Sequence, residues 1–363
     1  MKVNIIYGSI KNYNEKIPKE DVISLSEFVR WLDARRNNPV EDQLIGVYKS
    51  LTVSTEEYGG VTDAFLEMFV LSILIYQQYL KYEVIYLHNP PKRIFDQIQI
   101  YKEKFEISIE KSSYNTVTID SLRRIKNDFE DHIVGQEEVK NNLLLSLYEL
   151  TKKSNSKPKV IMLYGPPGVG KTETAHFINK SINDDHKILR KQFSMFHNES
   201  FYSYIFGDRS NSFAKDLMDR ESNIILLDEF DKCNSIFFSA FYQLFDEGVY
   251  EDKFYEVDLS NALILCTSNY LSEDDIRKNL GEAIFSRFDA FIKFNEFTPV
   301  VKELLIDKIY EEEISHYSYD EIEVISQHNV PNLLKQYLTS INNARDIRRY
   351  LKQMIAVPLI KEI

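Results

Sequence analysis

The chain has 363 residues, enough for two or three domains, of which 44% are hydrophobic and 28% charged. The net charge is −12, and the sequence has no basic arm or tail. Both features disfavour nonspecific binding to nucleic acid or to an acidic membrane. Cys233 and Cys266 are the only cysteines and show neither metal spacing nor a disulfide framework, as in a reducing compartment. The longest apolar run, residues 68–76, is too short for a membrane span and predicts a buried helix. We therefore expect a cytoplasmic protein with no membrane segment.

Residues 1–120 are predicted to form a separate α+β block. Residues 2–6 indicate a strand, and residues 28–32 belong to a helix that Asn37-Asn38-Pro39 should end. The strongest helix should start at Thr62 or Asp63 and run through Tyr82, before the break at residues 89–91. No set of side chains in this block suits catalysis, so we expect a binding or assembly domain.

The central feature of the sequence is a glycine-rich segment, residues 165–172, here called the phosphate loop. It fits the pattern G-x-x-x-x-G-K-[S/T] at every fixed position and lies between a predicted strand (159–164) and a predicted helix (172–182). Its members are Gly165, Pro166, Pro167, Gly168, Val169, Gly170, Lys171 and Thr172. Glycines let backbone N–H groups surround a phosphate, and the helix N-terminus adds partial positive charge. Lys171 is then predicted to reach the β- and γ-phosphates, and the Thr172 hydroxyl to ligate Mg²⁺.

A second motif follows about 50 residues later. Residues 223–229 form a short apolar run that ends in Asp228 and Glu229. Such a run places two carboxylates at the C-terminal edge of a parallel sheet, where α/β proteins bind ligands. We expect Asp228 to hold Mg²⁺, and Glu229 to accept a proton from the attacking water or to orient it.

A resemblance to a known family rests on several segments in a fixed order. Two helices, near 120–129 and from about 137 to Leu150, flank the segment Ile133-Val134-Gly135-Gln136, and a polar loop at 152–157 precedes the strand of the phosphate loop. Downstream, residues 226–232 resemble LLDEIEKA, 243–248 resemble LLQVLDDG, 261–269 resemble NTVVIMTSN, and 282–289 resemble PEFLNRID. With the phosphate loop and Asp228-Glu229 as Walker A and Walker B motifs, residues 121–363 resemble an AAA+ ATPase module, most of all that of the Clp-type protein unfoldases.

The resemblance implies the fold, the cofactors and the site. The fold would be a parallel P-loop sheet flanked by helices (residues 121–298) followed by a small helical lid (299–363) with helices near 299–314, 331–341 and 344–361. The cofactors would be ATP and Mg²⁺. Thr172 and Asp228 would hold the Mg²⁺ ion. The nucleotide would contact Ile133, Val134, the whole phosphate loop, Glu173 and Arg345. The catalytic set would be Lys171, Asp228, Glu229, Asn269, Arg287 and Arg345.

Three of these residues have family roles that fit their chemistry. Asn269 would be sensor 1, a neutral amide that positions water near the γ-phosphate. Arg287 would be an arginine finger acting in the neighbouring subunit of a ring, which the resemblance implies is a hexamer; the alternative is a surface ion pair with Asp289. Arg345, rather than Arg348 or Arg349, would be sensor 2, although Asn343 replaces the glycine usual before it.

The resemblance fails at one functional segment. The Gly-Tyr-Val-Gly pore loop of the unfoldases is missing; Tyr204, Phe206 or Phe213 could substitute or could be packing residues. No docking loop for a partner protease is evident. The leading hypothesis is a ring-forming ATPase that remodels a protein partner selected by residues 1–120. The alternatives are a nucleic-acid-directed ATPase, such as a loader or a mobile-element or phage-defence component, and a nucleotide-switched scaffold.

Overall fold

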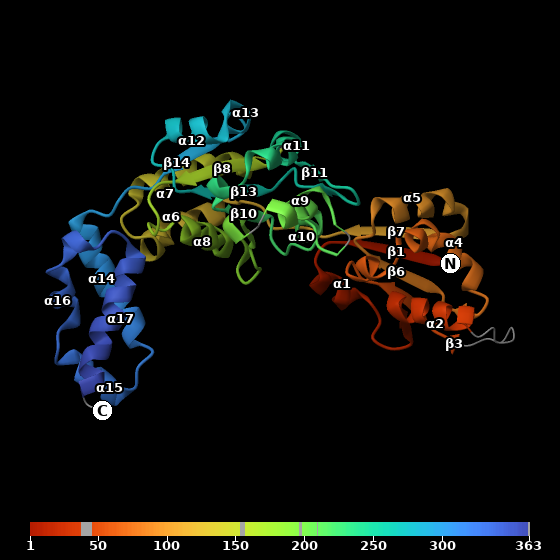
Figure 1. Ribbon diagram of the computed structural model, residues 1–363, viewed down its shortest axis with the longest axis horizontal. Coiled ribbons are helices and arrows are strands. Elements are labelled where there is room, and N and C mark those ends of the chain that lie inside the picture. Colours follow the sequence, from red (N-terminus) through yellow and green to blue (C-terminus); the bar gives the residue numbers. More distant parts are fainter. Residues whose placement is uncertain (38–45, 153–156, 196–197, 209, 362–363) are drawn as a thin grey trace.

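The computed structural model describes residues 1–37, 46–152, 157–195, 198–208 and 210–361. Three parts follow one another along an elongated molecule, and the two termini lie at opposite ends (Figure 1). An N-terminal sheet with its helices comes first, a second sheet lies in the middle, and a group of helices forms the C-terminal end. No helix within the described ranges combines the length and apolar character needed to cross a membrane.

The N-terminal part is built on a five-stranded sheet of order β2-β4-β6-β1-β7. Its strands are β1 (Lys2–Tyr7), β2 (Val22–Ser24), β4 (Ser50–Val53), β6 (Val84–His88) and β7 (Glu106–Lys111), and all neighbours pair in parallel. The helices are α1 (Ile10–Lys16), α2 (Leu25–Asn37), α3 (Asp63–Glu67), α4 (Phe69–Tyr76) and α5 (Lys92–Ile100), and a small parallel pair joins β3 (Gly46–Val47) to β5 (Leu80–Lys81). Because the sheet is parallel with helical crossovers, this part is α/β, and our α+β expectation for it was wrong.

The long helix expected from Thr62 to Tyr82 is also wrong. Thr62 does cap α3, but α3 ends at Glu67, and α4 then covers the apolar run. The chain turns back after α4: the Tyr82 hydroxyl donates to Ile73 O at 3.2 Å, and the Gln77 amide donates to Tyr82 O at 3.3 Å. Tertiary burial of Tyr82 therefore overrides local helix preference. The helix α2 ends at Asn37 as expected, whereas Asn38 and Pro39 lie outside the described residues.

The middle sheet has the order β14-β8-β13-β10-β9, with every pair parallel. Its strands are β8 (Lys159–Tyr164), β9 (Leu189–Gln192), β10 (Ile224–Asp228), β13 (Leu263–Ser268) and β14 (Ala290–Lys293). Alternate residues of the central strands enter two different cores, as buried parallel strands require. One core includes α6 (Ile119–His132), α7 (Glu137–Tyr148) and α8 (Lys171–Asn183).

The opposite core of this sheet is rich in aromatic side chains. It includes α9 (Asn198–Phe206), α10 (Phe213–Met218), α11 (Ser239–Glu247), α12 (Glu273–Leu280) and α13 (Glu282–Phe285), together with the antiparallel hairpin of β11 (Val249–Glu251) and β12 (Glu256–Asp258). Cys266 is fully buried here, as expected of a core residue. Short 3-10 turns occur at Glu57–Gly60, Lys102–Lys104, Glu149–Thr151, Phe193–Met195, Phe230–Lys232, Ser235–Phe237 and Leu338–Ser340.

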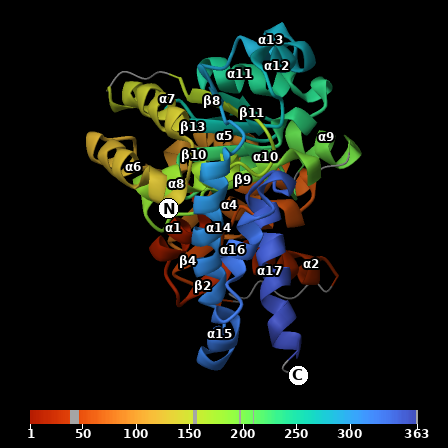
Figure 2. The same cartoon turned by 90° about the vertical axis from the view of Figure 1, so that its left-hand side faces the viewer.

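The C-terminal helices are α14 (Pro299–Ile314), α15 (Tyr319–Ser326), α16 (Val330–Lys335) and α17 (Ala344–Lys361) (Figure 2). The helices predicted at 299–314 and 344–361 have these bounds. We did not expect α15, which starts at a capping box on Ser318, and the segment predicted as one helix at 331–341 is split. Their apolar faces share one continuous core with α6, α7 and α8.

The N-terminal part contacts the middle part through α10 and the β11–β12 hairpin. Ile10 N donates to Asp219 Oδ1 at 2.5 Å, Lys92 N donates to Phe254 O at 2.9 Å, and Lys215 Nζ donates to Thr55 O at 3.3 Å. Lys92 also forms exposed ion pairs with two hairpin carboxylates, at 3.3 and 3.5 Å. The first sheet therefore reaches the second through backbone and side-chain hydrogen bonds.

Candidate functional site

The phosphate loop connects the C-terminal end of β8 to the N-terminus of α8, as predicted. Gly165, Gly168 and Gly170 have φ values of +140°, +73° and +104°, a region that side chains with a Cβ rarely adopt. A Cβ on Gly165 would lie 2.3 Å from Phe294 O, and one on Gly168 would lie 2.9 Å from Asn343 Cβ. The loop is therefore shaped by glycine and lies directly against the start of α17, where Ala344 N donates to Gly168 O at 3.2 Å.

Lys171 folds back onto its own loop. Its Nζ donates to Gly165 O and Pro166 O, both at 2.6 Å, and to Asn269 Oδ1 at 3.1 Å. Burial lowers the pKa of this amine to about 8; Asp231 and Asp228 raise it in part. The Lys171 ammonium is thus held by three neutral oxygens, two from its own loop and one from the residue that follows β13.

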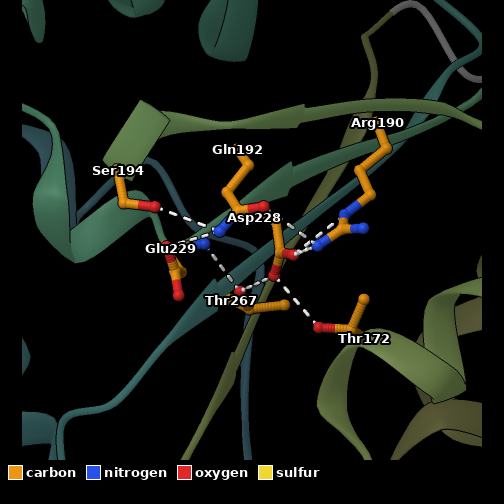
Figure 3. Close-up of polar contacts among 7 residues, drawn as sticks. All are labelled: Thr172, Arg190, Gln192, Ser194, Asp228, Glu229 and Thr267. Atoms are coloured by element: carbon orange, nitrogen blue, oxygen red, sulfur yellow. Dashed lines mark hydrogen bonds and ion pairs between the residues drawn. The ribbon is translucent and has the colours of Figure 1, made fainter. Parts of the chain in front are cut away.

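The carboxylate of Asp228 is surrounded by donors at the end of β10 (Figure 3). The hydroxyls of Thr172 and Thr267 donate to Oδ1 at 3.1 and 2.6 Å. Arg190, on the neighbouring strand β9, donates to Oδ2 through Nε at 3.0 Å and Nη2 at 2.5 Å. The Asp228 side chain is only 5% exposed, and all four contacts offset the cost of burying its charge.

Glu229 has a left-handed backbone, with φ 56° and ψ 47°. This conformation costs a residue with a Cβ about 1 kcal/mol or more and is found most often at functional sites. Glu229 N donates to Thr267 Oγ1 at 2.8 Å, and Glu229 Oε2 accepts from Gln192 Nε2 at 3.0 Å. The turn directs the Glu229 carboxylate to β9 rather than to the Thr172–Asp228 pair, as Figure 3 shows.

A cavity of about 440 Å³ lies between the middle sheet and the C-terminal helices, a volume suited to a small-molecule ligand. Ile133 and Val134 line one side, Asp228 and Glu229 another, and Arg345 lines it from α17. The predicted residues that line it are Ile133, Val134, Pro167, Gly168, Val169, Gly170, Lys171, Thr172, Glu173, Asp228, Glu229 and Arg345. Gly165, Pro166 and Asn269 reach the same place through their bonds to Lys171.

Two oxygens in this cavity suit a magnesium ion. Thr172 Oγ1 and Asp228 Oδ1 lie 3.1 Å apart, and Mg²⁺ prefers oxygen ligands. Across the described ranges no group of three or more histidine, cysteine or carboxylate side chains forms a metal site. A site with one hydroxyl and one carboxylate fits an ion that keeps waters and takes its other ligands from phosphates.

Arg348 and Arg349, the two alternatives to Arg345, are held in ion pairs. Arg348 pairs with Glu312 at 2.7 Å and with Glu313, and Arg349 pairs with Asp346 at 2.9 Å. Arg348 also lines the cavity, whereas the cavity lining does not include Arg349. These contacts favour Arg345 as the lid arginine that is available to a ligand.

Comparison with known proteins gives the same picture. Residues 156–311 match the family model of the AAA domain (Cdc48 subfamily). The chain is 26% identical over 281 residues to the chaperone protein ClpB of Clostridium tetani, covering 67% of this chain and 32% of that protein. It is 33% identical over 204 residues to the Lon protease of Cytophaga hutchinsonii, covering 50% of this chain and 24% of that protein.

Residues 156–311 are thus similar to an AAA domain, and the chain resembles an AAA+ module of the Clp type. The resemblance inferred from the sequence is therefore confirmed, as is the P-loop α/β fold. The chain spans between about a quarter and a third of the length of these relatives.

Arg287 lies outside the cavity of its own AAA+ module. Its Nε donates to Asp246 Oδ2 at 2.8 Å, Nη1 donates to Ala283 O, and the guanidinium lies 4.3 Å from the centre of the Tyr242 ring. The ion pair is thus with Asp246, not with Asp289 as the alternative supposed; Asp289 Oδ2 accepts from Val160 N at 2.8 Å. A residue that acts on a neighbouring subunit's nucleotide has to lie away from its own, so this position is compatible with a finger.

Two of the three candidate pore aromatics are packing residues. Tyr204 and Phe213 are 3% and 0% exposed, and the Tyr204 hydroxyl donates to Asp216 at 2.5 Å. Phe206 is 36% exposed, at the end of α9, and packs against Tyr202 and Phe237. Of the three, Phe206 alone is placed where it could touch a polymer substrate.

Our prediction of the site omitted Arg190, Gln192 and Thr267. Thr267 lies two residues before Asn269, within the segment 261–269 used for the resemblance, and its alternation with Cys266 could have revealed it. Arg190 and Gln192 lie on β9, whose sequence Leu-Arg-Lys-Gln has no apolar run, so no pattern marked it as a strand.

Proposed function

We propose that this chain is an ATP hydrolase that uses Mg²⁺ and works in a ring, with the hexameric form that its resemblance to Clp-type proteins implies. One observation carries the proposal: Lys171, Thr172, Asp228, Glu229 and Asn269 converge at the C-terminal ends of β8, β10 and β13, beside a cavity that Arg345 closes from the lid. This is the edge of a parallel sheet where α/β proteins bind nucleotides. We keep the division into residues 1–120, 121–298 and 299–363 as part of the proposal.

Each residue then has a role in phosphoryl transfer. Lys171 leaves its loop carbonyls to hold the β- and γ-phosphates, while loop N–H groups and the α8 N-terminus hold the phosphate charge. Thr172 and Asp228 hold Mg²⁺, which supplies charge neutralisation for the phosphates. Glu229 takes a proton from water, or orients that water, together with Asn269. Arg345 contacts the nucleotide from the lid, and Arg287 serves the adjacent subunit.

The mechanical output that we propose is remodelling of a protein partner chosen by residues 1–120. The contacts of the N-terminal part with α10 and the β11–β12 hairpin support it, because α10 leads into β10 and the hairpin leads into β13. A nucleotide between the sheet and the lid couples hydrolysis to rigid-body motion of the lid. ClpB of Clostridium tetani, a relative that matches 67% of this chain, is named a chaperone.

A nucleic-acid-directed ATPase is the second candidate. The burial of Tyr204 and Phe213 favours it, since these aromatics cannot grip a threaded polypeptide where they lie. A scaffold that binds ATP as a switch and hydrolyses it slowly is a third candidate; the full set of Asp228, Glu229, Asn269 and Arg287 argues against it.

Steady-state ATP hydrolysis tests the enzyme proposal, with Glu229→Gln as the variant. We expect hydrolysis by this variant to fall about 100-fold or more while ATP binding persists, because a general base contributes about 10²–10⁴-fold. Glu247→Gln, an exposed carboxylate at the end of α11, is the control and should keep wild-type turnover. Near wild-type turnover by Glu229→Gln would refute the assignment.

A pull-down with Glu229→Gln held in ATP, with and without nuclease, separates the two kinds of partner. A nuclease-resistant protein partner supports remodelling. Co-purification that nuclease abolishes supports the nucleic-acid candidate instead.

A further inference from the structure

Arg190 holds the oxygen of Asp228 that faces away from the Thr172 hydroxyl. The guanidinium donates two hydrogen bonds to Oδ2, at 3.0 and 2.5 Å, while the two threonine hydroxyls already use Oδ1. Both carboxylate oxygens therefore already accept hydrogen bonds from side chains of the protein. A divalent cation beside Asp228 would meet a positive charge in direct contact with its own ligand.

Arg190 and Asp228 differ in how far their side chains are exposed. The Asp228 side chain is 5% exposed and fixed at the end of a central strand, whereas the Arg190 side chain is 42% exposed on the edge strand β9. Arg190 also lines the nucleotide cavity, so its head can leave Asp228 without leaving the site. Displacement therefore requires rotation of a long side chain and leaves the backbone in place.

A second contact connects Arg190 to the predicted base. Arg190 Nη2 donates to Gln192 Oε1 at 3.3 Å, and Gln192 Nε2 donates to Glu229 Oε2 at 3.0 Å. One amide thus lies between the guanidinium that holds Asp228 and the carboxylate that would activate water. Movement of Arg190 removes a contact from the group that orients Glu229.

We propose that Arg190 is a positioning residue that competes with the metal for the charge of Asp228: from Oδ2 it neutralises and orients the carboxylate, and Mg²⁺ bound at Oδ1 displaces it by charge repulsion. This inference rests on the proposed function, because it assumes that Asp228 is on the metal side of an ATP site. It predicts that Arg190 opposes metal binding and favours the binding of metal-free nucleotide. If Arg190 only supported the structure of β9, its removal would change metal affinity and the affinity for metal-free nucleotide in the same direction.

The sign of each effect follows from charge. Without Arg190, Asp228 is a buried carboxylate with no cation in direct contact, so a divalent cation gains affinity for it. The same uncompensated carboxylate repels the phosphates of ATP when no metal is present. Charge-assisted contacts of this kind correspond to changes of about tenfold or more in an equilibrium constant.

The test measures binding in wild-type protein, Arg190→Ala and Arg190→Lys, with Arg124→Ala as a control. Arg124, on α6, forms an exposed ion pair with Asp184 and does not line the cavity. Mn²⁺ alone is titrated into each protein and followed by electron paramagnetic resonance. A fluorescent ATP analogue is then titrated in EDTA and, separately, in excess Mg²⁺.

For Arg190→Ala we expect Mn²⁺ to bind about tenfold tighter than to wild type, and the ATP analogue to bind about tenfold weaker in EDTA. In Mg²⁺ the loss of nucleotide affinity should shrink or reverse. Arg190→Lys should restore affinity in EDTA in part, and Arg124→Ala should match wild type. If the alanine variant does not fold, Arg190→Gln replaces it with the same expectations.

Equal Mn²⁺ affinity in wild type and Arg190→Ala overturns the proposal, as does a loss of nucleotide affinity that is the same in EDTA and in Mg²⁺. Asp228→Asn separates this failure from that of the proposed function. If Mn²⁺ with ATP binds equally to wild type and Asp228→Asn, Asp228 is not on the metal side and the proposed site is wrong. If Asp228→Asn weakens it but Arg190→Ala changes nothing, only the inference about Arg190 fails.

Discussion

Lys171 Nζ donates to Asn269 Oδ1 at 3.1 Å, which joins the phosphate loop to the end of β13. The two residues are separated by 98 positions, and parallel pairing of β8 with β13 brings their strand ends together. The Asn269 amide therefore holds the Lys171 ammonium, the group that we propose binds the phosphates. This relationship gives Asn269 a measurable part in hydrolysis.

We predict that Asn269→Ala lowers the turnover number of ATP hydrolysis by about 10- to 100-fold, the scale of a positioned polar group at a transition state. Nucleotide affinity should change less than about threefold, because Lys171 keeps its two carbonyl partners and its charge. Steady-state kinetics and a binding titration measure the two effects. Asn261→Ala, at an exposed position before β13, is the matched control. A drop in affinity as large as the drop in turnover would contradict the assignment.

Lys171→Ala should abolish measurable nucleotide binding, with a loss of affinity of about 100-fold or more. The variant removes the single ammonium in direct contact with the loop, and a charged group that binds phosphate contributes several kcal/mol in a partly buried site. Titration of a fluorescent ATP analogue measures it. Lys180→Ala, on the exposed face of α8, should bind like wild type. If Lys171→Ala bound the ATP analogue as tightly as wild type, the phosphate loop would not be the nucleotide-binding site.

The phosphate loop and its flanks could be predicted because their signals are local. The strand at 159–164 was predicted with the bounds of β8, and the helix after the loop differs from α8 by one residue at each end. Glycine at left-handed φ, a buried apolar run and a periodic helix each leave a mark in the sequence over a few residues.

The parts that could not be predicted depend on long-range pairing. The strand β9 pairs only with β10, at the edge of the sheet, so burial does not impose an apolar sequence on it. Its polar side chains Arg190 and Gln192 are specified by Asp228 and Glu229, which lie 37 or more residues away. The same reason applies to Tyr82, whose burial against α4 ended a helix that local preference would have extended.

Arg287 gives a prediction about assembly. Arg287→Ala should reduce hydrolysis by about 100-fold or more, since an arginine finger contributes about 10³–10⁵-fold. A mixture of Arg287→Ala with Lys171→Ala subunits should regain activity, because the first supplies an intact nucleotide site and the second an intact finger. With random mixing, about a quarter of the sites are competent in a ring.

The control for this experiment is Arg277→Ala; Arg277 lies on α12 and forms an ion pair with Glu282. It should keep wild-type activity alone and need no complementation. Absence of any recovery in the mixture, although both variants assemble, would place Arg287 outside the catalytic machinery.

His88 gives a prediction about pH and the stability of the N-terminal part. It is 1% exposed; Thr55 lies 2.8 Å from Nδ1, Gly8 O lies 2.8 Å from Nε2, and the Tyr13 ring stacks on it at 4.7 Å. Burial lowers the pKa of His88 from 6.5 to about 4. Between these values the unfolded chain binds a proton that the folded chain excludes, so the free energy of unfolding decreases as pH falls from about 6.5 towards 4.

Urea unfolding followed by the fluorescence of Trp31 measures this effect, since Trp31 is the only tryptophan and packs against the same core as β6. Wild type should lose stability on the order of 3 kcal/mol more than His88→Gln between pH 7 and pH 4. The difference between the two proteins isolates His88 from the carboxylates that titrate over the same range. His328→Gln, at an exposed position, should follow the wild-type profile. Parallel profiles for wild type and His88→Gln would mean that the buried imidazole accepts its proton without cost to the fold.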